Sequence, residues 1–409
     1  MDETRMMTTI QTWTAILFAV ACYLISPVLS LIVVFWLFWL IQRPAISLSL
    51  IGGFSLALPA LSYMPLSTDD ATRLFAVVAS MQTVPLDNLY HWLRLWAQDY
   101  LNYPLFTAMM YVTARHFQND VLPFVVAGVT YAAIMYTVQR FGAVMHLQPT
   151  ITLLTTIASL LWISYLELVS SMRFTMACSL ALLIVVQIYL APKGRHFWLA
   201  QLWLLVPVLI HPGALIIVVP TLLTTFMRPG KVWVKGIWAA ALIGLLGYFV
   251  IFQAHYSYIA MLVTRFTSYQ TGAFSYVTSP QRLLHLGEGL IIMLAGALQL
   301  MCLGRRDALT TPTMRTLRTL LLTYLGFIIV SLLVVNIAIR YMTVLPIIGL
   351  LGVAVMTADH VRTSQTLKWL NVVLLCGVCG AGLIYNISFL HMTFTTIHWL
   401  FPLAGYGPF

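Results

Sequence analysis

Four arginines stand at the ends of very apolar segments, and their type and position point most directly to chemistry: Arg173, Arg265, Arg282 and Arg340. The charge bias of the loops predicts all four on the outer side of a membrane, where positive charge is unusual. Arginine beside hydrocarbon is costly and therefore indicates an anionic ligand. Diphosphate suits its planar donor fork best. Each arginine taken singly is equally well explained as an anchor that snorkels to the headgroups, whereas four together favour a ligand.

Other polar residues near apolar runs are candidates for acid–base chemistry. His211 lies in an apolar segment and is followed by a Pro-Gly pair. A neutral imidazole near an anion can accept a proton or donate a hydrogen bond to phosphate. Asp69 and Asp70 follow an apolar run, where they could activate a hydroxyl or simply cap a helix and pair with Arg73. The sequence does not rank His211 against the two aspartates as the base.

Composition decides the class of protein that must position these residues. The chain has 409 residues, 61% hydrophobic and 8% charged, and its mean hydropathy is +0.93. Soluble domains have about 25% charged residues, so we predict a polytopic membrane protein. The net charge of +10 comes mostly from short loops between apolar runs, where basic residues are inner-side anchors, and this excludes nucleic acid as a partner. No cluster of metal ligands is apparent, and no cofactor is expected.

Apolar runs of about 20 residues predict an all-α integral membrane bundle of about eleven segments, forming a single domain over residues 1–409. The first run, 13–41, is either one long tilted helix or two short helices that turn at Ser26 and Pro27. Further spans are predicted at 46–61, 121–138, 151–165, 174–190, 234–253, 286–303, 317–336, 341–356 and 369–385.

Three segments between these spans are distinctive. Residues 62–120 form a first outer loop with Trp- and Tyr-rich amphipathic stretches, which are typical of helices lying in the membrane interface. Residues 197–227 begin and end beside basic residues, so both ends are predicted on the inner side. The segment should therefore be a broken helical hairpin that turns at His211. Residues 254–285 form a second outer loop.

The stretch from Ser170 to Val219 resembles the central motif of the EpsG family of Wzy-type polysaccharide polymerases. That motif has an outer arginine opening a helix, a basic inner turn, and a histidine in a broken hairpin; Arg173 and His211 match its two polar positions. The segments STDDATRLF, YIAMLVTRFTSYQTG and IRYMTVLPIIG resemble the family's outer aspartate segment, outer loop and late arginine helix, so the likeness covers nearly the whole chain. Pro212 and the absence of a glutamine after Arg173 depart from the pattern.

The resemblance implies a GT-C-like enzyme in the bacterial inner or plasma membrane, with its site facing the periplasm or cell exterior. It would transfer a polyprenyl-diphosphate-linked oligosaccharide onto the non-reducing end of another lipid-linked repeat unit, without metal. A chain-length regulator is implied as a partner only by this likeness. The candidate site residues are Arg173, Arg340, Arg265 and Arg282 for the diphosphate, Tyr269 and Tyr276 for sugar faces, and His211, Asp69 and Asp70 for acid–base chemistry.

Two other functions remain open. The paired aspartates are also similar to GT-C glycosyltransferases that use polyprenyl-phosphate sugars. A transporter of anionic lipid-linked sugars would line its path with the same arginines. Transporters commonly have internal repeats and charges at the bilayer midplane, whereas here no repeat is convincing and the charges gather at one face, which favours an enzyme.

Overall fold

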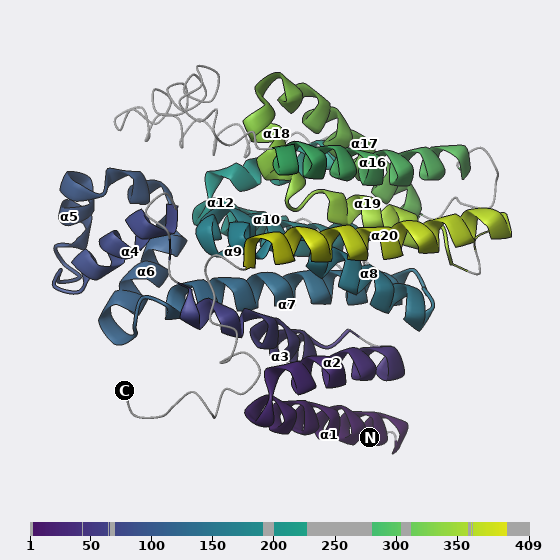
Figure 1. The fold of residues 1–409 in the computed structure, drawn as a ribbon, viewed down its shortest axis with the longest axis horizontal. Coiled ribbons are helices and arrows are strands. Elements are labelled where there is room, and N and C mark those ends of the chain that lie inside the picture. The colour runs from purple at the N-terminus through teal and green to yellow at the C-terminus, as the bar shows by residue number, and fades with distance from the viewer. Residues whose placement is uncertain are drawn as a thin grey trace.

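The computed structural model describes residues 3–42, 44–63, 65, 70–190, 200–226, 280–303, 312–358, 361 and 363–390. All regular structure in these ranges is helical (Figure 1). By length and composition, five helices could cross a membrane, as expected of an integral membrane protein: Val121–Val144, Met172–Leu190, Pro280–Cys302, Thr313–Ser331 and Gln365–Asn386. The count of about eleven segments stays a prediction, and the predicted span 234–253 lies outside the described residues.

The first apolar run folds as two helices, α1 (Glu3–Ile25) and α2 (Pro27–Ile41). Ser26 between them is extended, and its hydroxyl accepts a hydrogen bond from the Leu29 amide. Proline is well tolerated at the start of a helix because that amide would have no helical partner. The Ser30 hydroxyl donates to the Ala19 carbonyl oxygen at 3.1 Å, which joins the two helices side by side. The two-helix alternative is therefore confirmed.

Close packing of small residues joins α3 (Ile46–Ala57) to α7 (Val121–Val144). A Cβ atom added at Gly53 would lie 2.5 Å from the Gly128 carbonyl oxygen and 2.6 Å from the Ala132 amide nitrogen. Small residues allow membrane helices to approach this closely, since hydrocarbon offers no hydrophobic force to hold them together. The α3–α7 pair is the scaffold on which the later helices pack.

Residues of the predicted first outer loop form a separate group of short helices at one end of the molecule (Figure 1). They are α4 (Asp70–Met81), α5 (Leu89–Trp96), η2 (Gln98–Asn102) and α6 (Pro104–His116). Arg115 stabilises this group by donating to the carbonyl oxygens of Val84 at 2.8 Å and Gln82 at 3.0 Å. These two hydrogen bonds tie the end of α6 to the segment that follows α4.

The middle of the chain supplies α8 (Pro149–Trp162), α9 (Tyr165–Ser170), α10 (Met172–Val185) and η3 (Val186–Leu190). The predicted hairpin contains η4 (Gln201–Leu204), α12 (Leu205–Ile210), η5 (Pro212–Ala214) and α13 (Leu215–Phe226). His211 is extended, with φ −157° and ψ 123°, so the helical run breaks at the predicted residue. Residues 197–199 and 227 of this segment lie outside the described ranges.

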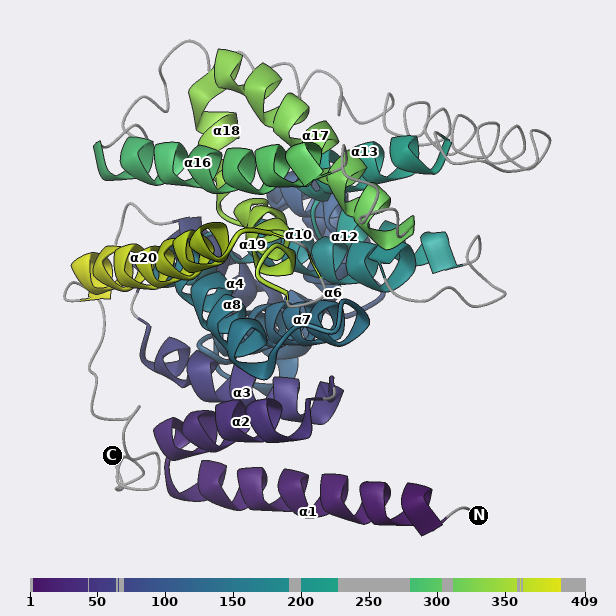
Figure 2. The same ribbon diagram turned by 90° about the vertical axis from the view of Figure 1, so that its right-hand side faces the viewer.

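The last group comprises α16 (Pro280–Leu303), α17 (Pro312–Ser331), η8 (Leu332–Val334), α18 (Val335–Met342), α19 (Pro346–Val355) and α20 (Gln365–Leu390). Figure 2 shows α1 at one edge of the bundle and α16, α17 and α18 at the other. The predicted boundary between two spans at 336–341 falls inside α18. Arg340 therefore lies in the last turn of a short separate helix.

Candidate functional site

Arg173 lies against two tyrosines of the predicted first outer loop. Its guanidinium carbon is 5.0 Å from the ring centroid of Tyr100 and 4.5 Å from that of Tyr103. Both rings are buried, and Arg173 itself is partly exposed. Cation–π contacts of this kind occupy the face of a guanidinium, while its N–H groups point outward in the plane and can bind an anion.

The helix dipole gives Arg173 a further reason to bind an anion. It is the second residue of α10, where the helix dipole is positive. A cation in this position is unfavourable, and an anion bound here would interact well with both the arginine and the helix end.

Tyr100 remains a neutral ring beside this arginine. Burial raises the pKa of the Tyr100 phenol, while the charges of Arg173 and Arg73 oppose that rise. A phenol with a raised pKa stays protonated throughout the neutral range, since its unperturbed pKa is about 10. The contact between Tyr100 and Arg173 is therefore insensitive to pH near neutrality.

His211 joins the same cluster through Tyr103. The two rings stack with centroids 5.1 Å apart and planes 6° apart. The Gly213 amide donates to His211 Nδ1 at 2.9 Å. A neutral imidazole that accepts at one nitrogen carries its proton on the other, so this hydrogen bond assigns the proton to Nε2. In this tautomer His211 offers a donor at Nε2.

The edge of the His211 ring that carries Nδ1 is also tightly packed. A Cβ atom added at Gly213 would lie 2.7 Å from His211 Nδ1 and 2.9 Å from Phe174 Cδ2. Phe174, the neighbour of Arg173, meets the imidazole edge-on with centroids 5.6 Å apart. The structure thus brings two of the predicted site residues, Arg173 and His211, onto one set of aromatic rings.

Tyr341, the residue after Arg340, contacts the aromatic cluster around His211. The ring of Tyr341 packs against Phe174 with centroids 5.4 Å apart. Arg340 is partly exposed. The end of α18 therefore lies beside the start of α10, which carries Arg173.

Arg282 lies near an acidic residue that sequence analysis did not include in the site. Its Nε is 3.8 Å from one carboxylate oxygen of Glu167, and the Thr343 hydroxyl donates to the other oxygen at 2.9 Å. Glu167 precedes Arg173 by less than two turns, on α9. The Glu167 carboxylate therefore offsets part of the positive charge of Arg282.

A second group of residues surrounds His285, which sequence analysis also missed. The imidazole lies 3.9 Å from the ring of Trp162 and 4.6 Å from that of Tyr385, measured between centroids. Its Nδ1 is 3.9 Å from a carboxylate oxygen of Glu288. Its buried Nε2 has no hydrogen-bond partner within the described part of the chain. The only signal for this group in the sequence is the three-residue spacing of His285 and Glu288 on one helix.

The other predicted site residues are not part of these contacts. Asp70 begins α4 and is exposed. Asp69, Arg265, Tyr269 and Tyr276 lie outside the described residues, as does most of the second outer loop 254–285. Among the described residues, no three His, Cys, Asp or Glu side chains are placed to share a metal ion.

Comparison with models of known protein families, with curated proteins and with solved structures found no match to this chain.

Proposed function

We propose that this chain is a polysaccharide polymerase, which joins polyprenyl-diphosphate-linked oligosaccharide repeat units at the outer face of a bacterial inner or plasma membrane. The observation that supports it most is the meeting of Arg173 and His211 on Tyr103, because these two residues carry the resemblance in the sequence. The proposal includes a GT-C-like bundle of about eleven membrane segments. The remaining predicted ligands, Arg265, Tyr269 and Tyr276, keep their proposed roles on the second outer loop.

The chemistry is displacement of a diphosphate at a sugar carbon. The acceptor hydroxyl oxygen forms a bond to C1 of the donor sugar, the bond from C1 to the diphosphate oxygen breaks, and the lipid diphosphate leaves with that electron pair. Negative charge develops on the leaving group. Arg173 and Arg340 would stabilise it in a site poor in water, where fixed positive charges are most effective, and no metal is required for that role.

The tautomer of His211 favours one of its two candidate roles. With Nδ1 accepting from Gly213, the ring offers an N–H at Nε2 and would donate to a diphosphate oxygen. The acceptor's proton would then go to a carboxylate, Asp69 or Asp70. In this scheme Arg173 and His211 bind the same anion.

Purified protein in lipid vesicles tests the function directly. Supplied with lipid-diphosphate repeat units in the presence of a chelator, it should make a ladder of polymers. Consumption of a monosaccharide-phosphate lipid without polymer would instead identify a GT-C glycosyltransferase. Movement of the lipid-linked sugar across the membrane without bond formation would identify a transporter.

A further inference from the structure

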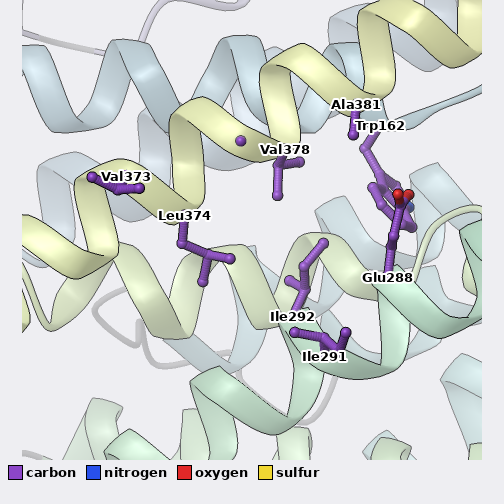
Figure 3. Close-up of a pocket in the computed structure, with 9 residues that line it drawn as sticks. Trp162, Glu288, Ile291, Ile292, Val373, Leu374, Val378 and Ala381 are labelled. Carbon is purple, nitrogen blue, oxygen red and sulfur yellow. The ribbon is translucent and has the colours of Figure 1, made fainter.

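A groove lies between α16 and α20, beside the His285 group. It encloses about 340 Å³ and is lined by Trp162, Glu288, Ile291, Ile292, Val373, Leu374, Gly377, Val378 and Ala381. Figure 3 shows Trp162, the Glu288 carboxylate and Ala381 at one end and Val373 and Leu374 at the other. Apart from Glu288, its walls are apolar. The volume is at the lower end of the roughly 300–1,000 Å³ of small-molecule sites.

The groove is held open by contacts at both ends. Beyond its apolar end, the side-chain amides of Gln299 and Asn371 donate to each other at 2.8 and 2.9 Å, which joins α16 to α20. At the other end, His285 of α16 stacks against Tyr385 of α20. Between these two links, Gly377 and Ala381 have too little side chain to fill the space. The opening is therefore built into the helix pair.

The charges along α16 define what kind of molecule fits. Arg282, His285 and Glu288 follow one another at three-residue spacing, and the groove begins at Glu288. A carboxylate repels phosphate, so an anionic head cannot enter the groove and would stop at Arg282. From there an uncharged chain would run over the outside of the His285–Tyr385 stack, pass Glu288 and lie among the apolar walls. The predicted lipid-facing side of the groove is formed by Ile291 and Val373, 60% and 66% exposed.

We propose that this groove binds the isoprenoid chain of a lipid-diphosphate substrate, with the diphosphate held outward at Arg282. The proposal rests on the proposed polymerase function. A groove of about 340 Å³ takes part of one chain, and its outer end leads through Glu167 and Thr343 to the helix ends that carry Arg173 and Arg340. Glu288 fixes the depth of the chain by excluding the charged head.

Two glycines of α20 offer a matched test. A Cβ atom at either Gly377 or Gly380 would meet nothing within 4 Å, so a larger side chain is tolerated at both. Gly377 lines the groove, and Gly380 does not. Gly377→Leu should fill the groove, while Gly380→Leu adds the same side chain to the same helix and leaves the groove open.

The experiment is photo-crosslinking of the full chain in nanodiscs with polyprenyl diphosphate that carries a diazirine on its chain. Labelled peptides from residues 288–292 and 373–381 are expected in the parent and in Gly380→Leu, and labelling should fall at least five-fold in Gly377→Leu. Equal labelling in all three proteins would overturn the proposal. So would a diazirine phospholipid that labels the same peptides and is not displaced by excess polyprenyl diphosphate.

Polymer synthesis by the same proteins separates this proposal from the function on which it rests. Groove labelling in a protein that makes no polymer supports the groove and contradicts the polymerase. Polymer synthesis together with labelling outside the groove supports the polymerase and contradicts the groove. Equal melting temperatures of Gly377→Leu and Gly380→Leu in detergent would show that lost labelling comes from filling the groove.

Discussion

Tyr103 is the side chain through which Arg173 and His211 meet. Its ring contacts the guanidinium at 4.5 Å and stacks on the imidazole at 5.1 Å. Both contacts use the ring rather than the phenol oxygen. The orientation of the proposed diphosphate ligands therefore depends on an aromatic side chain at position 103.

Tyr103→Phe should accordingly keep activity close to that of the parent, whereas Tyr103→Ala should lose it. Removing the cation–π contact with the partly exposed Arg173 costs about 1 kcal/mol and removing the stack on His211 about 1 kcal/mol more, together equivalent to a roughly 30-fold fall in rate. Initial rates of polymer synthesis from purified lipid-linked repeat units measure the difference. A loss of activity in Tyr103→Phe comparable to that in Tyr103→Ala would show that the phenol oxygen is needed as well as the ring.

Gly213 positions the imidazole without contacting any substrate in the proposed scheme. A methyl group there would lie 2.7 Å from His211 Nδ1, so Gly213→Ala must displace the ring or break its hydrogen bond to the 213 amide. We expect synthesis to fall at least ten-fold with little change in melting temperature. Gly326→Ala is the control, because a Cβ at Gly326 would meet nothing within 4 Å. Parent-like rates in Gly213→Ala would argue against a fixed imidazole.

At the scale of elements, the α3–α7 pair holds the scaffold through small residues. Gly53→Ala would place a methyl group 2.5 Å from the Gly128 carbonyl oxygen and force the helices apart. Overpacking of this kind costs about 1–3 kcal/mol. We expect a lower midpoint of thermal unfolding in detergent than for the parent. Gly380→Ala, where space is open, should leave the midpoint unchanged or raise it slightly; equal midpoints for both variants would contradict the importance of this packing.

The breaks between elements were the part of the fold most open to prediction from sequence. A proline follows the break at Ser26 and the break at His211. Proline is favoured at the start of a helix, whereas inside a helix it removes a backbone hydrogen bond. α18 was missed, since no breaker separates residues 336–341 from the preceding apolar run. The short helix η8 separates α18 from α17, and α18 packs against α16, which periodicity does not reveal.

The candidate site was predictable only in part, because only some of its residues are unusual in an apolar segment. Arg173 and His211 stand out because a charge or an imidazole in an apolar segment is rare. The tyrosines beneath them, Tyr100 and Tyr103, are ordinary aromatic residues of the predicted loop, and nothing in the sequence pairs them with Arg173. The contact of Arg282 with Glu167 and the stack of His285 on Trp162 join residues more than a hundred positions apart, so only tertiary structure brings them together.

For the whole molecule, the distribution of basic residues predicts which end faces outward. Asp99→Cys, on the first outer loop, should react with a membrane-impermeant maleimide added to intact cells. Lys193→Cys, on a predicted inner loop, should react only after permeabilisation. Both substitutions are made in a chain whose five native cysteines are replaced by serine. Labelling of Lys193→Cys in intact cells would reverse the orientation and place the arginine site inside.

We propose that Arg173 stabilises the departing diphosphate. The most direct test of this role compares the rates of polymer synthesis by Arg173→Ala and Arg94→Ala in the presence of a chelator. Arg94 is an exposed arginine of the same outer loop region as Tyr100 and Tyr103, so it controls for net charge. We predict a loss of at least 100-fold for Arg173→Ala, about 2.7 kcal/mol or more of transition-state stabilisation, and little change for Arg94→Ala. Equal rates in the two variants would show that Arg173 does not stabilise the leaving group.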